Sequence, residues 1–102
     1  MHHPKTEDEY DRLKQSTSLA VVQFSANWCG PCRVVKPEIE KLAKEYKDVT
    51  FIYVDVDELE DLPNGRDVKG VPTFKIYKDG MLVSYMAGAN AQKVREQIEQ
   101  YK

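Results

Sequence analysis

The sequence has few of the features that mark several large classes of protein. Only two of its 102 residues are cysteine, too few for the disulfide framework of a small secreted domain. No apolar run approaches the length of a membrane span, and residues 1–4 lack the apolar region of a signal peptide. These absences favour a reducing intracellular compartment, and we expect the cytoplasm. A targeting segment lost by trimming would escape this argument.

Excess charge of one sign is also absent. Lys and Arg number 15 against 17 Asp and Glu, for a net charge of −2, and the basic residues are scattered. We therefore expect no nucleic-acid partner, because surfaces that bind nucleic acid carry clustered Lys and Arg residues. The hydrophobic content of 41% is ordinary for a globular protein, and this length suits a single domain over residues 1–102.

Apolar runs alternate with helical patterns along the chain. Runs rich in Val, Ile and Phe predict strands at 19–26, 50–56, 73–77 and 82–87, with a rudimentary strand at 2–3 as a further option. Helical spacing and caps predict helices at 7–15, 32–46, 59–62 and 91–101. Strands separated by helices imply parallel pairing, and the final hairpin adds an antiparallel pair. The fold class is α/β, with a mixed central sheet of four to five strands flanked by four helices.

Three local signals support these boundaries. Thr6 and Glu9 have the spacing of a capping box, and Asn90 is suited to cap the last helix. Residues 78–80 read Lys-Asp-Gly, a hairpin turn signal. Pro37 lies inside the second helical pattern, where we expect a kink.

The two cysteines, Cys29 and Cys32, are separated by two residues at a strand-to-helix junction. The thiolate is the nucleophilic form, and the positive end of a helix dipole favours it at Cys29. Gly30 and Pro31 suit the first turn of a helix, and Arg33 adds positive charge. Cys32 lies about one turn further on, where it should be more buried. It would attack the Cys29 sulfur to resolve a mixed disulfide.

Two other interpretations of the cysteine pair are weaker. A structural disulfide across so short a ring would constrain little chain. A zinc site would need two more ligands, and only His2 and His3 are available, side by side near the chain end. Redox chemistry is the favoured interpretation, with Trp28 shielding the pair and offering an apolar contact surface.

Further motifs complete a resemblance to the thioredoxin family over nearly the whole chain. The matching segments are residues 24–32 (Phe-Ser-Ala-Asn-Trp-Cys-Gly-Pro-Cys), 36–37, 54–57, 70–74, 78–80 and 88–90. The resemblance implies the thioredoxin fold and a cis peptide bond between Val71 and Pro72, beside the cysteines. It also implies a shallow client-binding groove formed by Trp28, Gly30, Pro31, Val71, Pro72, Gly88 and Ala89.

The function implied by the resemblance is protein disulfide reduction, an enzymatic role in electron transport and cell redox homeostasis. The partners would be disulfide-containing client proteins and a separate NADPH-dependent thioredoxin reductase, with no membrane partner. The chain would bind no cofactor or metal, hold only the redox-active Cys29–Cys32 disulfide, and act as a monomer. Pro31, where a histidine would favour an oxidant, argues for a reductant. The alternatives are a protein-binding module of this fold and a domain of a larger oxidoreductase.

The chain departs from the family pattern in three places. Gln23 stands where the family usually has a buried Asp that takes the proton of the resolving cysteine, and Gln cannot ionise. Tyr53 replaces a Lys of bacterial relatives. Asp55 either serves Cys32 through water or merely caps the following turn, and the second interpretation is favoured. Residues 61–67 predict a shortened helix followed by a loop. The chain also lacks any cysteine beyond the pair, so we expect no regulatory oxidation of a further cysteine.

Overall fold

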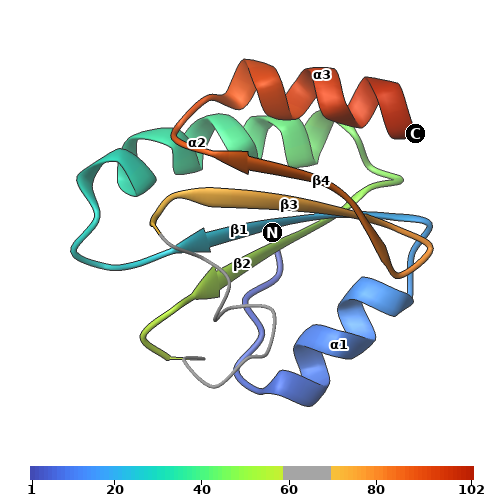
Figure 1. The fold of residues 1–102 in the computed structure, drawn as a ribbon, viewed down its shortest axis with the longest axis horizontal. Helices are drawn as coiled ribbons and strands as arrows, with labels where there is room; N and C mark the ends of the chain where they lie inside the picture. Colours follow the sequence, from blue (N-terminus) through green and yellow to red (C-terminus); the bar gives the residue numbers. More distant parts are fainter. Residues whose placement is uncertain (59–69) are drawn as a thin grey trace.

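A mixed four-stranded sheet forms the centre of the molecule (Figure 1). The computed structural model describes residues 1–58 and 70–102. Its elements are α1 (Glu7–Gln15), β1 (Leu19–Ser25), α2 (Gly30–Glu45), β2 (Thr50–Asp55), β3 (Thr73–Lys78), β4 (Met81–Ala87) and α3 (Ala91–Tyr101). Every predicted strand and three of the four predicted helices are confirmed. The predicted helix at 59–62 and loop at 61–67 lie outside the described residues.

The strand order β2-β1-β3-β4 corrects one prediction about pairing. The neighbours β1 and β2 are parallel, as expected for strands joined through a helix. In contrast, β3 pairs antiparallel with both β1 and β4, so the expectation of parallel pairing does not extend to β3. The reason is where β3 starts, because Thr73 lies opposite Phe24 at the end of the sheet where β1 and β2 finish. From that end of the sheet, β3 can only run antiparallel to β1.

Helices cover both faces of the sheet, as predicted (Figure 1). Beneath α2 and α3 the core joins odd-numbered residues of β1 to helix residues such as Val35, Ile39 and Ile98. On the other face, Tyr10 of α1 packs with Val22 and Phe24 of β1. Since side chains alternate between faces of a strand, β1 contributes to both cores, which explains why all of its residues are buried.

Local hydrogen bonds confirm the predicted caps. The Thr6 hydroxyl accepts from the Glu9 amide at 3.1 Å, and the Asn90 side chain accepts from the Lys93 amide at 3.1 Å. The Glu9 carboxylate accepts from the Lys5 amide rather than from that of Thr6, so the box closes one residue earlier than expected. The kink at Pro37, a residue inside α2, stays a prediction.

The N-terminal segment lengthens the edge of β2. His2 forms an isolated parallel bridge with Ile52, which accords with the rudimentary strand considered at residues 2–3. The His2 amide donates to the Phe51 carbonyl at 2.8 Å, and the Tyr53 amide donates to the His2 carbonyl at 2.7 Å. This bridge fixes His3 beside the Tyr53 ring, at 5.0 Å between centroids.

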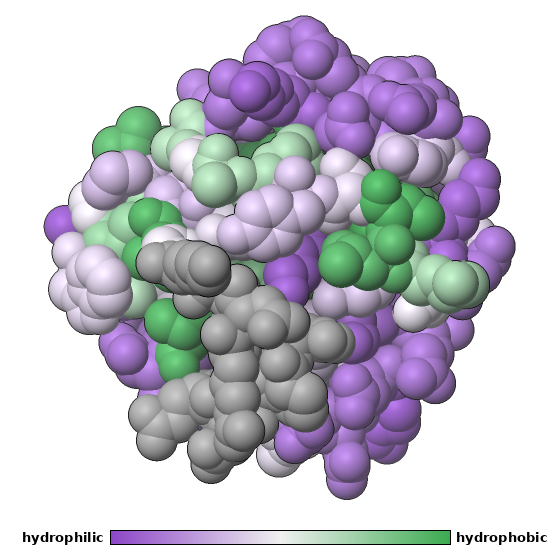
Figure 2. Space-filling model, in the orientation of Figure 1, coloured by the Kyte–Doolittle hydropathy of each residue, from purple (hydrophilic) through white to green (hydrophobic). Residues whose placement is uncertain are grey.

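Exposed apolar side chains gather in two regions of the described surface. Trp28 and Val34 flank the start of α2, whereas Met81, Leu82 and Tyr85 belong to β4. Figure 2 shows a hydrophobic patch over the region where β4 begins, while the outer surface of α3 is hydrophilic. Within the described residues, no helix combines the length and apolar character needed to cross a membrane.

Candidate active site

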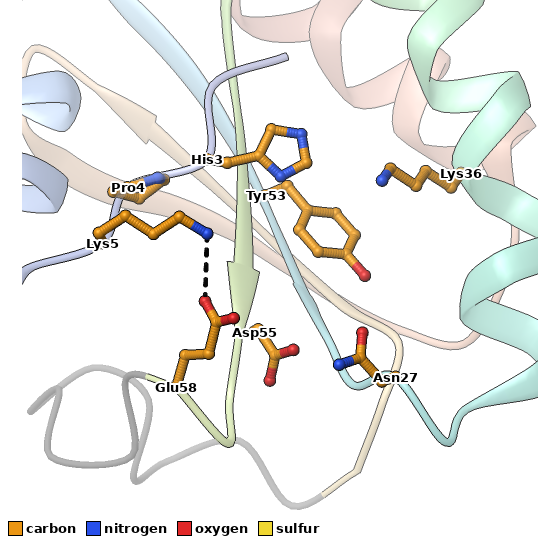
Figure 3. A pocket seen from close by; sticks show the side chains of 8 residues that line it. All are labelled: His3, Pro4, Lys5, Asn27, Lys36, Tyr53, Asp55 and Glu58. Carbon is orange, nitrogen blue, oxygen red and sulfur yellow. Dashed lines mark ion pairs between the residues drawn. The ribbon is translucent and has the colours of Figure 1, made fainter.

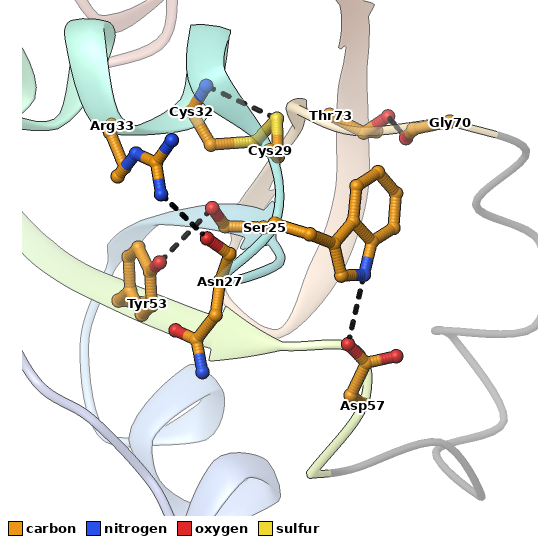
Figure 4. Close-up of a disulfide and its surroundings, with 10 residues drawn as sticks. Ser25, Asn27, Cys29, Cys32, Arg33, Tyr53, Asp57, Gly70 and Thr73 are labelled. Atoms are coloured by element: carbon orange, nitrogen blue, oxygen red, sulfur yellow. Dashed lines mark hydrogen bonds between the residues drawn. A yellow bond between two sulfur atoms is a disulfide. The ribbon is translucent and has the colours of Figure 1, made fainter.

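Cys29 and Cys32 form a disulfide at the start of α2, as the sequence predicted. Their Cα atoms are 5.3 Å apart. Cys29 is the N-cap of α2, and its Sγ accepts a hydrogen bond from the Cys32 amide at 3.2 Å (Figure 4). The sulfur of Cys29 therefore occupies the position where helix amides offer unpaired donors, which favours negative charge there.

Both cysteines are buried, which the sequence indicated for Cys32 but not for Cys29. Cys32 is 1% exposed and Cys29 is 4% exposed, so the predicted order is right but the difference is small. The pair packs with Ala26, and the partly buried Val56 and Val71 lie against it. Residues from three separate segments thus enclose the oxidised ring.

Trp28 lies on the outer side of the disulfide and is 69% exposed. Its indole Nε1 donates to the Asp57 carboxylate at 3.1 Å (Figure 4). Asp57 follows β2 and was noted in the sequence only as part of a family motif. An exposed ring held by one hydrogen bond offers an apolar contact surface in a defined orientation.

The Val71–Pro72 peptide bond is cis, which confirms the expectation from the family resemblance. Pro72 is buried, and its carbonyl accepts from the Gly88 amide at 2.9 Å. Gly88 has φ 97°, a conformation that suits glycine, so this residue type is required where the two loops meet. Ala89 is exposed beside it. Contact of these residues with a client stays a prediction.

Gln23 lies on the inner side of the site and is completely buried. Neither its amide nitrogen nor its amide oxygen has a hydrogen-bond partner among the described residues. It is paired with Tyr53 on β2 and Phe74 on β3, on the face of β1 that lies beneath α2. A buried polar group without a hydrogen-bond partner costs about 1–3 kcal/mol of folding stability, so the Gln23 amide destabilises the folded state.

A second polar feature of the inner side is a hydroxyl pair. The Tyr53 hydroxyl donates to the Ser25 hydroxyl at 3.0 Å, and Ser25 is completely buried (Figure 4). Sequence reasoning did not single out Ser25, because a serine at a strand end is common. Asp55 accepts from the Asp57 amide at 2.8 Å, which is the turn-capping role favoured from the sequence. Its service to Cys32 through water stays a prediction.

A cavity of about 180 Å³ opens beside this hydroxyl pair (Figure 3). It is lined by His3, Pro4, Lys5, Asn27, Lys36, Tyr53, Asp55 and Glu58. Lys36 Nζ lies 4.5 Å from the centroid of the Tyr53 ring, and Lys5 pairs with Glu58 at 3.5 Å. Burial, and then repulsion from Lys36, lowers the pKa of His3 from its ordinary value of 6.5, so the His3 ring is uncharged at neutral pH.

Metal binding finds no support in the described part of the chain. No group of three or more His, Cys, Asp or Glu residues within residues 1–58 and 70–102 is arranged to hold a metal ion. His2 and His3 lie near β2 rather than beside the cysteines, since His2 pairs with Ile52.

Comparison with known proteins agrees with this geometry. The thioredoxin family model matches residues 2–100. The chain belongs to the thioredoxin family. It is 42% identical over 96 residues to thioredoxin of Ophiophagus hannah, covering 94% of this chain and 91% of that protein. It is 47% identical over 81 residues to thioredoxin of Gallus gallus, covering 79% and 77%. The structure of Fasciola hepatica thioredoxin superimposes with a TM-score of 0.93 at 41% identity, covering both chains fully.

Family membership and the cysteine geometry together define the chemistry. Thioredoxin-family proteins are protein disulfide oxidoreductases, and the two cysteines here stand at disulfide distance. The Cys29–Cys32 pair is therefore the redox-active group. It exchanges two electrons with other disulfides by thiol–disulfide exchange, and this chain is a protein disulfide reductase.

Proposed function

We propose that Cys29 is the nucleophile and Cys32 the resolving thiol of the reductase. The position of Cys29 at the N-cap of α2 supports this assignment, because its sulfur already accepts an amide there. The Cys29 thiolate attacks a client disulfide and releases one client thiol. Cys32 then attacks the Cys29 sulfur, so the client leaves as a dithiol and the enzyme holds the disulfide.

We further propose that clients dock on the outer side of the disulfide. The exposed Trp28 and Pro31 provide apolar contact, and Gly30, Gly88 and Ala89 permit close approach of another backbone. Val71 would pair with an extended client segment, as an added strand. Pro72, cis and buried, supports Val71 from below.

The proposed partners are disulfide-containing proteins and an NADPH-dependent thioredoxin reductase that restores the dithiol. Both reacting sulfurs lie in one chain, which supports a monomeric catalytic unit, and we propose that this unit binds no cofactor. Neither nucleic acid nor a membrane is required. The setting we propose is the cytoplasm, with electron transport to client proteins maintaining cell redox homeostasis, since a reducing compartment keeps such a pair active.

Insulin reduction with dithiothreitol tests this function. The wild-type protein should accelerate precipitation of the insulin chains well above the uncatalysed rate, and the Cys29→Ser variant should return it to background. A wild-type rate at background would contradict the reductase and favour a binding module that uses the same surface.

Equilibration with glutathione buffers tests the proposed direction of electron flow. A reductant should be oxidised by buffers in which most glutathione is reduced, giving a potential below that of the glutathione pool. A potential well above that pool would instead assign the protein as an oxidant. The intact mass of the native polypeptide separately tests whether this domain is part of a larger oxidoreductase.

A further inference from the structure

The proposed resolving step, on which this inference rests, requires Cys32 to become a thiolate inside the protein. A buried thiolate is costly unless hydrogen bonds or charges stabilise it. The residue beneath it that could have taken its proton is Gln23, an amide that cannot ionise. The stabilising group must therefore be a hydrogen-bond donor on the inner side of the disulfide rather than a base at position 23.

Ser25 is placed to be that group. It ends β1 on the same face as Val21 and Leu19, which pack beneath α2, and Cys32 lies buried in the first turn of α2. Figure 4 shows the Ser25 side chain between Tyr53 and the cysteine pair. Ser25 is completely buried.

The hydrogen bond between the two hydroxyls leaves Ser25 with a donor to spare when Tyr53 is the donor. Tyr53 donates to the Ser25 oxygen at 3.0 Å, so the single hydroxyl hydrogen of Ser25 is not used in that bond. No other hydrogen bond of the Ser25 side chain is found within residues 1–58 and 70–102, although its backbone carbonyl accepts from the Val56 amide at 2.9 Å. A donor that itself accepts a hydrogen bond is strengthened by polarisation.

Tyr53 is held in place from several sides. The Lys36 ammonium lies 4.5 Å from its ring centroid, and the His3 ring packs 5.0 Å away. Among the described residues, the charged or titratable side chains around the hydroxyl pair and the cysteines are His3, Lys5, Arg33, Lys36, Asp55, Asp57 and Glu58. The Lys36 ammonium, over the ring, further polarises the phenol toward donation.

We propose that Ser25, oriented by Tyr53, donates a hydrogen bond to the Cys32 thiolate and thereby speeds resolution of the mixed disulfide. Cys32 loses its proton, its sulfur bonds to the Cys29 sulfur, and the bond from Cys29 to the client sulfur breaks. The departing client thiolate takes up one proton, so protons and electrons balance. Ser25 and Tyr53 are positioning residues in this scheme, acting on the thiolate without transferring electrons.

Stopped-flow reaction of the reduced full chain with dithionitrobenzoate separates the two steps. The first release of thionitrobenzoate reports attack by Cys29, and the second reports attack by Cys32 on the mixed disulfide. In the wild type the rate of the second release should rise with pH to a plateau as Cys32 ionises. Cys29→Ser should abolish the first release at this site. A wild type without a first release would contradict the proposed function, separately from this inference.

The Tyr53→Phe and Ser25→Ala variants should slow the second release by about tenfold at neutral pH, the effect of losing one hydrogen bond to a charged group. The pH midpoint of that release should rise by about one unit. The first release should change by less than about twofold, since Cys29 draws on the helix amides instead. Ser25→Thr, which keeps the hydroxyl, should restore the wild-type midpoint.

Two matched variants on β4 serve as controls. Ser84→Ala removes a serine hydroxyl that donates to Gln97 at 2.7 Å, and Tyr85→Phe removes a phenol from an exposed residue. Both should leave the two releases unchanged. The proposal is overturned if Tyr53→Phe and Ser25→Ala keep the wild-type midpoint. It is equally overturned if Asp55→Asn alone shifts the midpoint, because Asp55 would then govern the ionisation of Cys32.

Discussion

The two sides of the Cys29–Cys32 disulfide contrast in what they present to the sulfur atoms. On the outer side stand an exposed indole at Trp28, an exposed Pro31 and a glycine at 88. On the inner side Gln23 and Ser25 are completely buried and polar. In the proposed function the outer side contacts the client, while the inner side accommodates the negative charge that Cys32 carries only during the reaction.

This contrast explains how two cysteines three positions apart can have different tasks. The Cys29 sulfur accepts an amide hydrogen bond at the start of α2, where any helix N-terminus offers unpaired amides. Cys32 has no such support and depends on the side chains beneath it. Because those side chains are neutral here, the inner side stabilises a thiolate by donating hydrogen bonds rather than by accepting its proton.

The sharpest test of the contrast replaces one cysteine at a time. Cys32→Ser should abolish turnover and leave the client bound to Cys29 as a stable mixed disulfide, because the serine hydroxyl cannot resolve it. Mass spectrometry of the protein after reaction with a client disulfide measures this adduct. Cys29→Ser is the matched control and should form no adduct. An adduct on Cys32 in that variant would reverse the assigned roles.

Placing a carboxyl on the inner side should make the site respond to pH. In Gln23→Asp, burial would raise the pKa of the new carboxyl above its usual value of about 3.9. Its ionisation should then couple to that of Cys32 and alter the pH profile of disulfide reduction by up to about tenfold. Insulin reduction across the pH range measures the profile, and an unchanged profile would contradict this coupling.

The same variant should lose stability as pH rises. A raised pKa means that the folded state holds the proton more tightly than the unfolded state. The free energy of unfolding should therefore fall above about pH 4, by about 1.4 kcal/mol for each unit of pKa difference. Urea unfolding at several pH values checks this, with the wild type, which has no ionisable group at position 23, as the reference.

Removing the amide of Gln23 should stabilise the protein. Gln23→Met keeps a similar volume and eliminates two buried polar atoms that have no partner among the described residues, so the free energy of unfolding should rise by about 1–3 kcal/mol. Urea unfolding measures it. Gln97→Met is the control, because the Gln97 amide oxygen already accepts from Ser84 and its removal should bring no gain. A gain in both variants would show a general effect of methionine.

Most of the architecture follows from patterns that the sequence displays directly. Apolar runs located the strands, and Asn90 and Thr6 located two helix starts, because those residue types act through neighbours three positions away. The pairing of β3 was not predicted, since it depends on which end of the sheet the chain re-enters. That is a long-range property that no local pattern carries.

The site shows the same division. The redox role of the two cysteines was predicted from their spacing, and the cis peptide bond before Pro72 was predicted from the family resemblance. The partnership of Tyr53 with Ser25 joins residues 28 positions apart in the chain, and only the parallel register of β1 and β2 brings them together. The bond from Trp28 to Asp57 depends likewise on the turn after β2.

Weakening the hydrogen bond from Trp28 to Asp57 should have the smallest effect, and it tests only the outer side of the disulfide. Asp57→Asn keeps the shape of the residue but replaces a charged acceptor of the Trp28 indole by a neutral one. Charge-assisted hydrogen bonds are about twice as strong as neutral ones, so the ring should become more mobile and the KM for a protein client should rise about two- to fivefold. The chemical step should not change, because Cys29 and Cys32 keep their surroundings. Trp28 is the only tryptophan of the chain, so its fluorescence anisotropy reports this mobility directly. A fall in kcat without a change in KM would place Asp57 with the inner side of the disulfide instead.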